Sequence, residues 1–411
     1  MLSRAENELL TRTGPDAPMG RLMRRYWLPA VFSDQIARPD SPPVRVRLLG
    51  EKLVAFRDSL GRVGLLDERC PHRTASLYFG RNEECGLRCV YHGWKFDVDG
   101  ACVDMPSEPP GGGFQHKVRI KSYPCVERAG IVWTYMGPPE LKPDFPELEW
   151  TLLPESQRYA SRHIQECNWL QGLEGGFDAS HIAFLHRGSG AINQNVVPSL
   201  YETVPTDFGL VIGSGRETPD DDIRWGTALF IAPFHKVFAS NPDGAHMWVP
   251  MDDENTMLYS VDCFPNGVNE ALLERSKAFG HIHTENIPGT DRAIQNRDND
   301  YMIDRAVQAS GRSFTGMKGL GIQDCAIQES MGPIADRTAE HLGVSDTAII
   351  QIRKALLQMV RDHEAGRTPP ALDPASYRAR STKFVLPRGA SFRSAMEDQL
   401  RAQYGAGAAA E

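Results

Sequence analysis

The sequence has few cysteines, no long apolar run and no excess of positive charge. Eight cysteines among 411 residues do not make a disulfide scaffold, and no apolar stretch approaches the length needed to cross a bilayer. The first residues include acidic side chains and lack the apolar core of a signal peptide. These absences predict a protein of the reducing cytoplasm with no membrane partner.

Basic surfaces and nucleotide-binding motifs are also missing. The formal net charge of -8 argues against nucleic acid as the main partner. No G-x-G-x-x-G motif lies between a predicted strand and a predicted helix, so no NAD or flavin site is expected in this chain. The apolar share of 41% is that of an ordinary globular protein, and the length favours two domains.

Hydrophobic periodicity divides the chain into four parts. Residues 1–30 have apolar residues at helical spacing and predict an N-terminal helical segment. From residue 44 the period becomes two, which predicts an all-β domain at 31–140 with a Pro-rich boundary at 137–146. An α+β domain is expected at 141–385, followed by a C-terminal tail at 386–411 that is partly disordered.

Within the α+β domain the pattern predicts both element types and one polar insert. Helices are expected over 164–185 and 348–361. Residues 266–321 have few signals and predict a long insert with mobile parts. Strands are expected over the following ranges: 210–212, 224–232, 237–239, 246–249 and 257–261.

Two clusters of metal-ligand residues lie inside the predicted β domain. The first is C-x-H at Cys70 and His72, and the second is C-x-x-H at Cys89 and His92. Mixed sets of this kind bind zinc or a two-iron cluster. Zinc sites usually have two cysteines in one motif and two histidines in the other. Here each half gives one cysteine and one histidine, as a Rieske centre requires, with two thiolates on one iron and two imidazoles on the other.

The runs Cys70-Pro71-His72-Arg73 and Cys89-Val90-Tyr91-His92-Gly93-Trp94 strongly resemble the Rieske iron–sulfur family. The resemblance implies a [2Fe-2S] cluster whose neutral imidazoles raise its reduction potential above that of a plant-type ferredoxin. Cys85 lies four residues before Cys89 and is interpreted as a small residue of the hairpin rather than a competing ligand.

A second candidate metal site lies in the α+β domain, at Asp178, His181 and His186. A helix would place Asp178 and His181 on one face. His186 would then lie about 140° around the helix from His181, so the two histidines can share a metal ion only if the helix bends or ends between them. Two imidazoles and one carboxylate form the facial triad that leaves positions open on Fe(II) for oxygen activation, and the carboxylate is expected from elsewhere in the chain.

Nearly the whole chain resembles the catalytic α subunit of Rieske non-haem iron aromatic ring-hydroxylating oxygenases, closest to the phthalate 4,5-dioxygenase and phenoxybenzoate dioxygenase group. The resemblance implies a helix-grip (START-like) catalytic domain with a curved antiparallel sheet. It also implies an acidic iron ligand in a late helix, which selects Asp324, with Glu329 and Asp336 as alternatives. The runs that carry it are Asn7–Arg12, Met23–Trp27, Asn168–Gln171, Trp248–Thr256 and Glu329–Arg337.

The same resemblance implies head-to-tail homotrimers, or stacked trimers, in which the cluster of one subunit serves the iron of the next. Asp178 would bridge the two centres by accepting hydrogen bonds from a cluster histidine of the neighbour and from its own His181. Asn168 resembles a family position near the iron, and its alternative interpretation is a polar residue at a helix N-terminus.

The expected partners follow from the resemblance and from the missing nucleotide motif. A separate NADH-dependent reductase, with a flavin and a plant-type [2Fe-2S] centre, would supply electrons, and O2 would react with an aromatic substrate. Members of this group commonly take aromatic carboxylates, and an anionic substrate needs a buried cation. The period of two from Leu210 through Ser214 favours Arg216 on the concave face, and Arg224 is a second candidate.

Three functions remain for comparison. A terminal oxygenase that hydroxylates an aromatic substrate uses both metal motifs, although the sequence does not separate ring dihydroxylation from monooxygenation or O-demethylation of an aromatic ether. A Rieske electron-transfer protein needs only the β domain and leaves the histidine pair unexplained. A zinc-dependent hydrolase or binding protein would lack the red-brown colour of an iron–sulfur protein.

Overall fold

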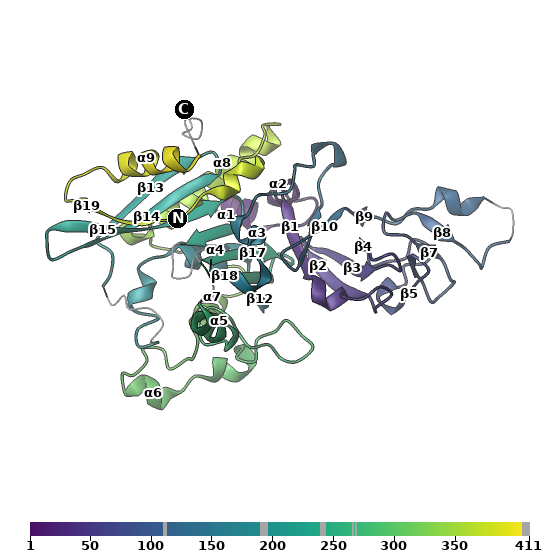
Figure 1. Cartoon of the computed structure of the whole chain (residues 1–411), viewed down its shortest axis with the longest axis horizontal. Coiled ribbons are helices and arrows are strands. Elements are labelled where there is room, and N and C mark those ends of the chain that lie inside the picture. Colours follow the sequence, from purple (N-terminus) through teal and green to yellow (C-terminus); the bar gives the residue numbers. More distant parts are fainter. Residues whose placement is uncertain (110–112, 190–195, 239–243, 265–266, 268, 405–411) are drawn as a thin grey trace. The chain divides into compact units, whose positions relative to one another are not determined.

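The computed structural model describes residues 1–109, 113–189, 196–238, 244–264, 267 and 269–404, and these form two compact units (Figure 1). The large unit comprises Met1–Thr13, Ala17–Leu22 and Asp144–Glu411, and the small unit comprises Gly14–Asp16 and Met23–Pro143. The division after Pro143 falls inside the Pro-rich segment. The predicted N-terminal segment forms two helices, α1 (Arg4–Thr11) and α2 (Pro18–Met23), but it is shared between the units.

Over its described residues, the small unit contains three antiparallel sheets. The period of two that begins at residue 44 corresponds to the three strands at Val44–Leu48, Glu51–Arg57 and Val63–Asp67. The strands, in spatial order within each sheet, are β1 (Trp27–Phe32), β11 (Ile131–Tyr135) and β10 (Cys125–Arg128); β2 (Val44–Leu48), β3 (Glu51–Arg57), β4 (Val63–Asp67) and β9 (Ser122–Tyr123); and β5 (Arg81–Glu83), β6 (Gly86–Arg88), β7 (Lys95–Phe96) and β8 (Cys102–Asp104).

The large unit is organised around one antiparallel sheet, as expected for the α+β domain. The C-terminal strand β19 (Lys383–Pro387) pairs with the first half of β15, and β16 pairs with its second half. Two strands, β19 and β16, therefore pair one after the other along β15, which also pairs with β14. The strand order is β12 (Arg158–Gln165), β18 (Thr256–Cys263), β17 (Gly244–Pro250), β16 (His235–Phe238), β15 (Asp222–Ile231), β14 (Gly209–Glu217) and β13 (Leu200–Thr206).

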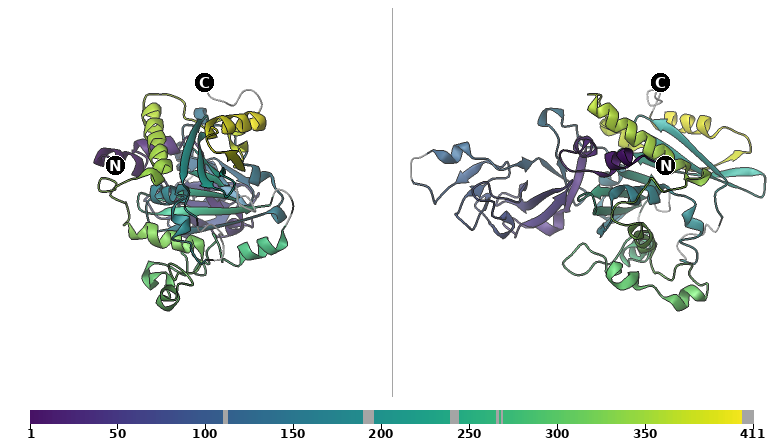
Figure 2. Two further views of the ribbon diagram at one scale, coloured as in Figure 1. Left: turned by 90° about the vertical axis from the view of Figure 1, so that its left-hand side faces the viewer. Right: turned by 180° about the vertical axis from the view of Figure 1, so that it is seen from behind.

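Helices cover this sheet (Figure 2). Helix α4 (Trp169–Phe177) contacts β17, α7 (Leu320–Ser330) and α8 (Thr347–Glu364), while α8 contacts β13 and β14. Gly172 and Gly176 lie on one face of α4, and a Cβ atom on either would come within 2.3 Å of the Trp248 indole. These glycines therefore allow the helix to approach the sheet closely. None of the described helices is long and apolar enough to cross a bilayer.

The helix predicted over 164–185 is wrong at both ends. Ile164 and Gln165 belong to β12, and α4 begins only after Asn168, whose side chain caps the helix. The helix ends at Phe177, because Asp178 has extended backbone angles. A short 3₁₀ turn follows at His181–Ala183. The amphipathic helix expected at 348–361 is confirmed as α8.

The predicted C-terminal tail contains regular structure over its described residues. Residues 386–411 include the end of β19 and helix α9 (Phe392–Tyr404), and only 405–411 lie outside the described residues. Phe392, Met396 and Leu400 recur every four residues and are buried, which gives the helix its apolar face. The polar region 266–321 likewise contains α5 (Glu270–Lys277) and α6 (Arg305–Ala309), although Asn266 itself lies outside the described residues. Helix α3 (Glu149–Leu152) is a single turn.

A buried ion network fixes α4 against α8. The Glu174 carboxylate accepts hydrogen bonds from Arg337 at 3.0 Å and from Arg353 at 2.6 Å. Arg353 also binds Glu340. Burial raises the pKa of Glu174, but the charges and hydrogen bonds of the two arginines outweigh this effect and hold the pKa below its ordinary value.

We expect Glu174→Gln to destabilise the large unit by about 3 kcal/mol, because it leaves two buried guanidinium groups without their shared carboxylate. Urea unfolding followed by circular dichroism measures the change. Glu340→Gln is the matched control, since Glu340 is partly exposed and its loss should cost about 1 kcal/mol or less. Equal effects of the two substitutions would contradict the central role of Glu174.

Candidate active site

Two similar loops of the small unit hold the Cys/His quartet. In the first loop Cys70 N–H donates to Ala75 O and Thr74 N–H donates to Cys70 O. In the second loop the equivalent bonds are Cys89 N–H to Trp94 O and Gly93 N–H to Cys89 O. The residue four positions after each cysteine, Thr74 or Gly93, has a positive φ, which closes the turn.

These loops bring the four side chains together. The His72 and His92 rings lie edge to face with centroids 4.4 Å apart, and His72 stacks on Trp94. Cys70 and Cys89 belong to the buried core of the small unit. Burial raises the pKa of Cys70 to about 11, and the neighbouring Cys89 acts in the same direction.

The quartet fits a two-iron cluster. The Nδ1 atom of His72 is buried and has no hydrogen-bond partner among the described residues. Such an atom is costly unless it binds a metal or a donor. The donor set of two thiols and two imidazoles, one of each per loop, matches the ligands of a Rieske centre.

In the large unit, the end of α4 controls the second group of metal ligands. Asp178 Oδ1 accepts hydrogen bonds from Ser180 N–H at 2.7 Å, from the Ser180 hydroxyl at 2.6 Å and from His181 N–H at 3.3 Å. The carboxylate thus stabilises a turn directly after the helix. The expectation that Asp178 and His181 share a helical face is therefore wrong, because no helix continues between them.

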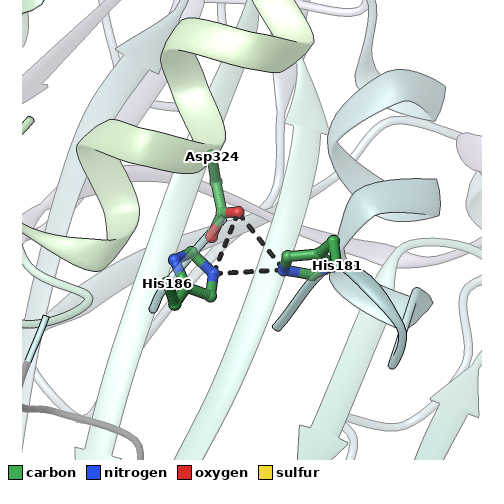
Figure 3. A group of neighbouring side chains, drawn as sticks. All are labelled: His181, His186 and Asp324. Carbon is green, nitrogen blue, oxygen red and sulfur yellow. Dashed lines mark hydrogen bonds and ion pairs between the residues drawn. The ribbon is translucent and has the colours of Figure 1, made fainter. Parts of the chain in front are cut away.

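The turn brings His181 and His186 to one point, where Asp324 of α7 meets them (Figure 3). The two histidine Nε2 atoms are 3.1 Å apart. Asp324 Oδ1 lies 3.5 Å from His181 Nε2 and 3.3 Å from His186 Nε2. Three donors that bind one metal ion at about 2.1 Å and near right angles lie about 3 Å apart. The geometry is thus suited to a single divalent metal ion.

Gln323 orients His186 for metal binding. The His186 Nδ1 atom lies 2.7 Å from Gln323 Oε1, and the Gln323 amide donates to Met317 O at 2.8 Å. Because the amide oxygen can only accept, His186 carries its proton on Nδ1 and leaves Nε2 free for a metal ion. The sequence prediction missed this role of Gln323.

Electrostatics at His181 and Asp324 also favour metal binding. Burial lowers the pKa of His181, and the nearby acids offset this only in part. Burial would raise the pKa of Asp324, but its contacts with His186 and His181 outweigh burial and hold it below the ordinary value. A neutral imidazole beside an ionised carboxylate is the protonation state that a metal ion requires. At His186 burial acts in the same direction as at His181, but the contacts with Asp324 and Gln323 outweigh it and raise the pKa.

Asp324 is the acid that the structure brings to the histidines, rather than either alternative. Glu329 is committed elsewhere, since it accepts hydrogen bonds from Glu166 N–H and from the Tyr301 hydroxyl. Asp336 accepts from the backbone N–H and the hydroxyl of Thr338.

Asn168 caps the start of α4, in agreement with its alternative interpretation as a polar residue at a helix N-terminus. Its side chain accepts from Leu170 N–H and donates to Thr11 O and Asp253 O. The residue is fully buried at the start of α4 and does not line the cavity beside the triad. Its polar atoms therefore serve to fix the helix and not to bind a ligand.

A cavity of about 450 Å³ adjoins the triad and is lined by the inner face of the sheet together with α4 and α7. Arg216 of β14 lines it, as the period-two pattern predicted. Arg224 is exposed and lies outside the lining, although it stands opposite Arg216 in the register of the strands. The second predicted substrate residue is therefore not supported.

Several polar residues of the cavity were not predicted from the sequence. Lys236, His246 and Asp262 all line it. Lys236 and Phe238 alternate with His235 and Val237 on β16, which begins two residues before the strand expected at 237–239, so Lys236 fell outside the predicted strand. Residue 239 lies outside the described residues.

Comparisons with known proteins agree with the two units. Residues 26–124 match the "Rieske [2Fe-2S] domain" model, and residues 217–404 match the "LigXa C-terminal domain like" model. The chain is 39% identical to the 3-chlorobenzoate-3,4-dioxygenase oxygenase subunit of Comamonas testosteroni, over 96% of this chain and 98% of that protein. It is 37% identical to the phthalate 4,5-dioxygenase oxygenase subunit of Pseudomonas putida, over 90% and 88%.

Solved structures support the fold. The terminal oxygenase of carbazole 1,9a-dioxygenase from Novosphingobium sp. KA1 is similar, with a TM-score of 0.58 and 20% identity. The similarity covers 87% of this chain and 96% of that chain. It agrees with the predicted combination of a Rieske β domain and a catalytic domain with an antiparallel sheet.

We expect Gln323→Leu to weaken binding of a divalent metal ion at the triad about 10- to 100-fold, because His186 loses the hydrogen bond that fixes its tautomer. Equilibrium dialysis against Fe(II), with metal analysis of the protein, measures the affinity. Gln358→Leu on the exposed face of α8 is the control. Unchanged affinity in Gln323→Leu would show that the hydrogen bond does not orient the ligand.

Proposed function

The chain belongs to the Rieske oxygenases and is the oxygenase component of such a system. From this membership we propose that it hydroxylates an aromatic carboxylate, which binds beside the triad of His181, His186 and Asp324. The observation that carries the proposal is the convergence of these three donors at a cavity that cationic side chains, among them Arg216 and Lys236, also line. The carboxylated aromatic substrates named for its two relatives point in the same direction.

We assign the triad to a mononuclear non-haem Fe(II) ion, which supplies O2 activation at the coordination positions that three protein ligands leave open. Asp324 contributes the negative charge, and Gln323 holds the Nδ1 proton of His186. An apolar part of the cavity wall lies beside the triad and excludes water from the metal site. It is formed by Phe177, Phe238 and Trp248. An aromatic ring fits among such side chains.

We assign Cys70, His72, Cys89 and His92 to the [2Fe-2S] cluster, which supplies one-electron transfer when it is bound. Because the sequence has no nucleotide-binding motif, the electrons come from a separate NADH-dependent reductase with a flavin and a plant-type [2Fe-2S] centre. We further propose homotrimers, or stacked trimers, in which neighbouring subunits pair the two centres.

We assign Asp178 to the role of the bridging acid in that arrangement. Its Oδ2 atom is 3.8 Å from His181 Nδ1, while Oδ1 is held by the turn after α4. The side chain is partly exposed, so Oδ2 is accessible to a donor from another subunit. The two oxygens thus have separate tasks: one fixes the turn and the other faces His181.

We expect Asp178→Asn to retain both metal centres and to lower turnover at least about 100-fold, because an amide NH2 group or a neutral oxygen replaces the charged acceptor. Iron and sulfide analysis together with single-turnover kinetics test this. Unchanged steady-state activity would refute the bridging role, and loss of iron would show a structural role instead.

Turnover of a panel of substituted benzoates tests the function as a whole. With a surrogate reductase and NADH, we expect substrate-dependent O2 uptake and a product whose mass contains added oxygen. The product mass also separates ring dihydroxylation from monooxygenation and from O-demethylation of a methoxybenzoate. His181→Ala is the control, and it should retain the visible spectrum of the cluster while losing the mononuclear iron and all O2 uptake. Stoichiometric mononuclear iron in that variant would refute the ligand assignment.

A further inference from the structure

We propose that Lys236 forms an anion-binding subsite at the end of the cavity next to the metal triad, and that it holds the carboxylate of the aromatic substrate. The proposal rests on the proposed function and extends it, since it names the residue that fixes the orientation of the ring. Neither of the arginines considered from the sequence occupies this position.

The strand β16 points Lys236 into the cavity. Lys236 and Phe238 line the cavity, whereas His235, which directly precedes Lys236, is buried on the other side against Tyr377. In the register of the sheet, Lys236 lies opposite His246 of β17, which also lines the cavity. The side chain is thus part of the inner face and not of the surface.

Lys236 lies within electrostatic range of the triad. The negative charges of Asp324 and Asp178 act on it, and its positive charge acts in turn on His181 and His186. No carboxylate among the described residues lies within ion-pair distance of its ammonium group. The cation is therefore close to the metal ligands without being neutralised by one of them.

The ammonium group is held in place but keeps donors available. Its one hydrogen bond among the described residues goes to Gly176 O, near the C-terminal end of α4, where the helix dipole favours a cation. The rings of Phe177 and Phe238 lie 5.6 and 5.1 Å from Nζ. A lysine has three N–H donors, so a carboxylate can bind without displacing these contacts.

The acids of the cavity are engaged with other partners. Asp324 faces the two histidines, and Asp178 accepts from Ser180 and His181. Asp262 accepts from the Ser276 hydroxyl and lies 3.4 Å from His283 Nε2. Burial lowers the pKa of Lys236 to about 8, a cost that a bound anion would remove.

Arg216 cannot share this subsite. It stands opposite Arg224 of β15, whereas Lys236 stands opposite Phe230 of the same strand. Six residues of β strand span about 20 Å, so the two cations lie toward different ends of the cavity. A carboxylate on a single ring that sits beside the triad therefore reaches Lys236 and leaves Arg216 to the outer part of the cavity.

Binding of benzoate and its uncharged analogue benzamide to the holoenzyme tests the subsite. Anaerobic titration calorimetry gives both dissociation constants without turnover. We expect Lys236→Met to weaken benzoate binding about 10- to 100-fold, because one charge-assisted hydrogen bond is lost. Benzamide binding should change less than about 3-fold, since no ion pair is involved. Lys236→Arg, which keeps the charge, should retain the preference for benzoate.

Lys354→Met, on the exposed face of α8, has the same change in net charge and is the matched control, with benzoate affinity expected to stay within about 3-fold. Iron content and the cluster spectrum confirm that each variant is loaded. Four results would overturn the subsite: unchanged benzoate affinity in Lys236→Met, equal loss of benzoate and benzamide, the same loss in Lys354→Met, or a wild-type preference for benzamide.

Failure of the subsite is distinguishable from failure of the proposed function. If the wild-type enzyme consumes O2 with uncharged aromatics and binds benzoate no better than benzamide, the subsite is wrong and the oxygenase function stands. If it consumes no O2 with any aromatic of the panel, the proposed function is wrong. The calorimetric comparison of Lys236→Met with the wild type then still decides whether Lys236 binds an anion.

Discussion

The hydrogen bonds from Ser180 and His181 to the Asp178 carboxylate determine how α4 ends, and the active site depends on that ending. An uninterrupted helix would point His181 and His186 in different directions. Because the helix stops, the two imidazoles converge on Asp324. The same ending leaves Gly176 O without a helical partner and available to Lys236. One turn thus positions metal ligands, the candidate bridging acid and a cation.

The rest of the large unit holds this turn in a defined place. Gly172 and Gly176 allow α4 to lie directly on Trp248, and the buried pair of arginines around Glu174 ties the helix to α8. The ligand Asp324 comes from α7, which also contacts α4. A shift of α4 would therefore move the histidines relative to the acid, and the rigid packing keeps the donor atoms close to metal-binding distances.

The sequence predicted the parts that depend on residue type and missed those that depend on where elements end. The Cys/His quartet and the histidine pair were predicted because few other residues supply such ligands, whereas Asp324 was selected by the family resemblance. The limits of α4 were not predicted, since the Asp178 turn is a local interaction that periodicity does not detect. Asn168 was left with two interpretations for the same reason: a helix cap and a site residue look alike until the partners of the side chain are known. Lys236 was missed because β16 begins two residues before the strand expected at 237–239.

Because β15 pairs with both β19 and β16, the cavity wall is built from parts of the sequence that lie far apart. Lys383 of β19 and Gly226 of β15 lie opposite each other in register, and both line the cavity. The last described strand, β19, therefore contributes to the cavity wall, although it lies about 200 residues after His181 and His186 in the sequence. Substitutions or length changes near the C-terminus can reshape what the cavity admits while the residues that hold the metal stay the same. This part of the cavity wall is thus encoded apart from the metal ligands, and it can change without changing them.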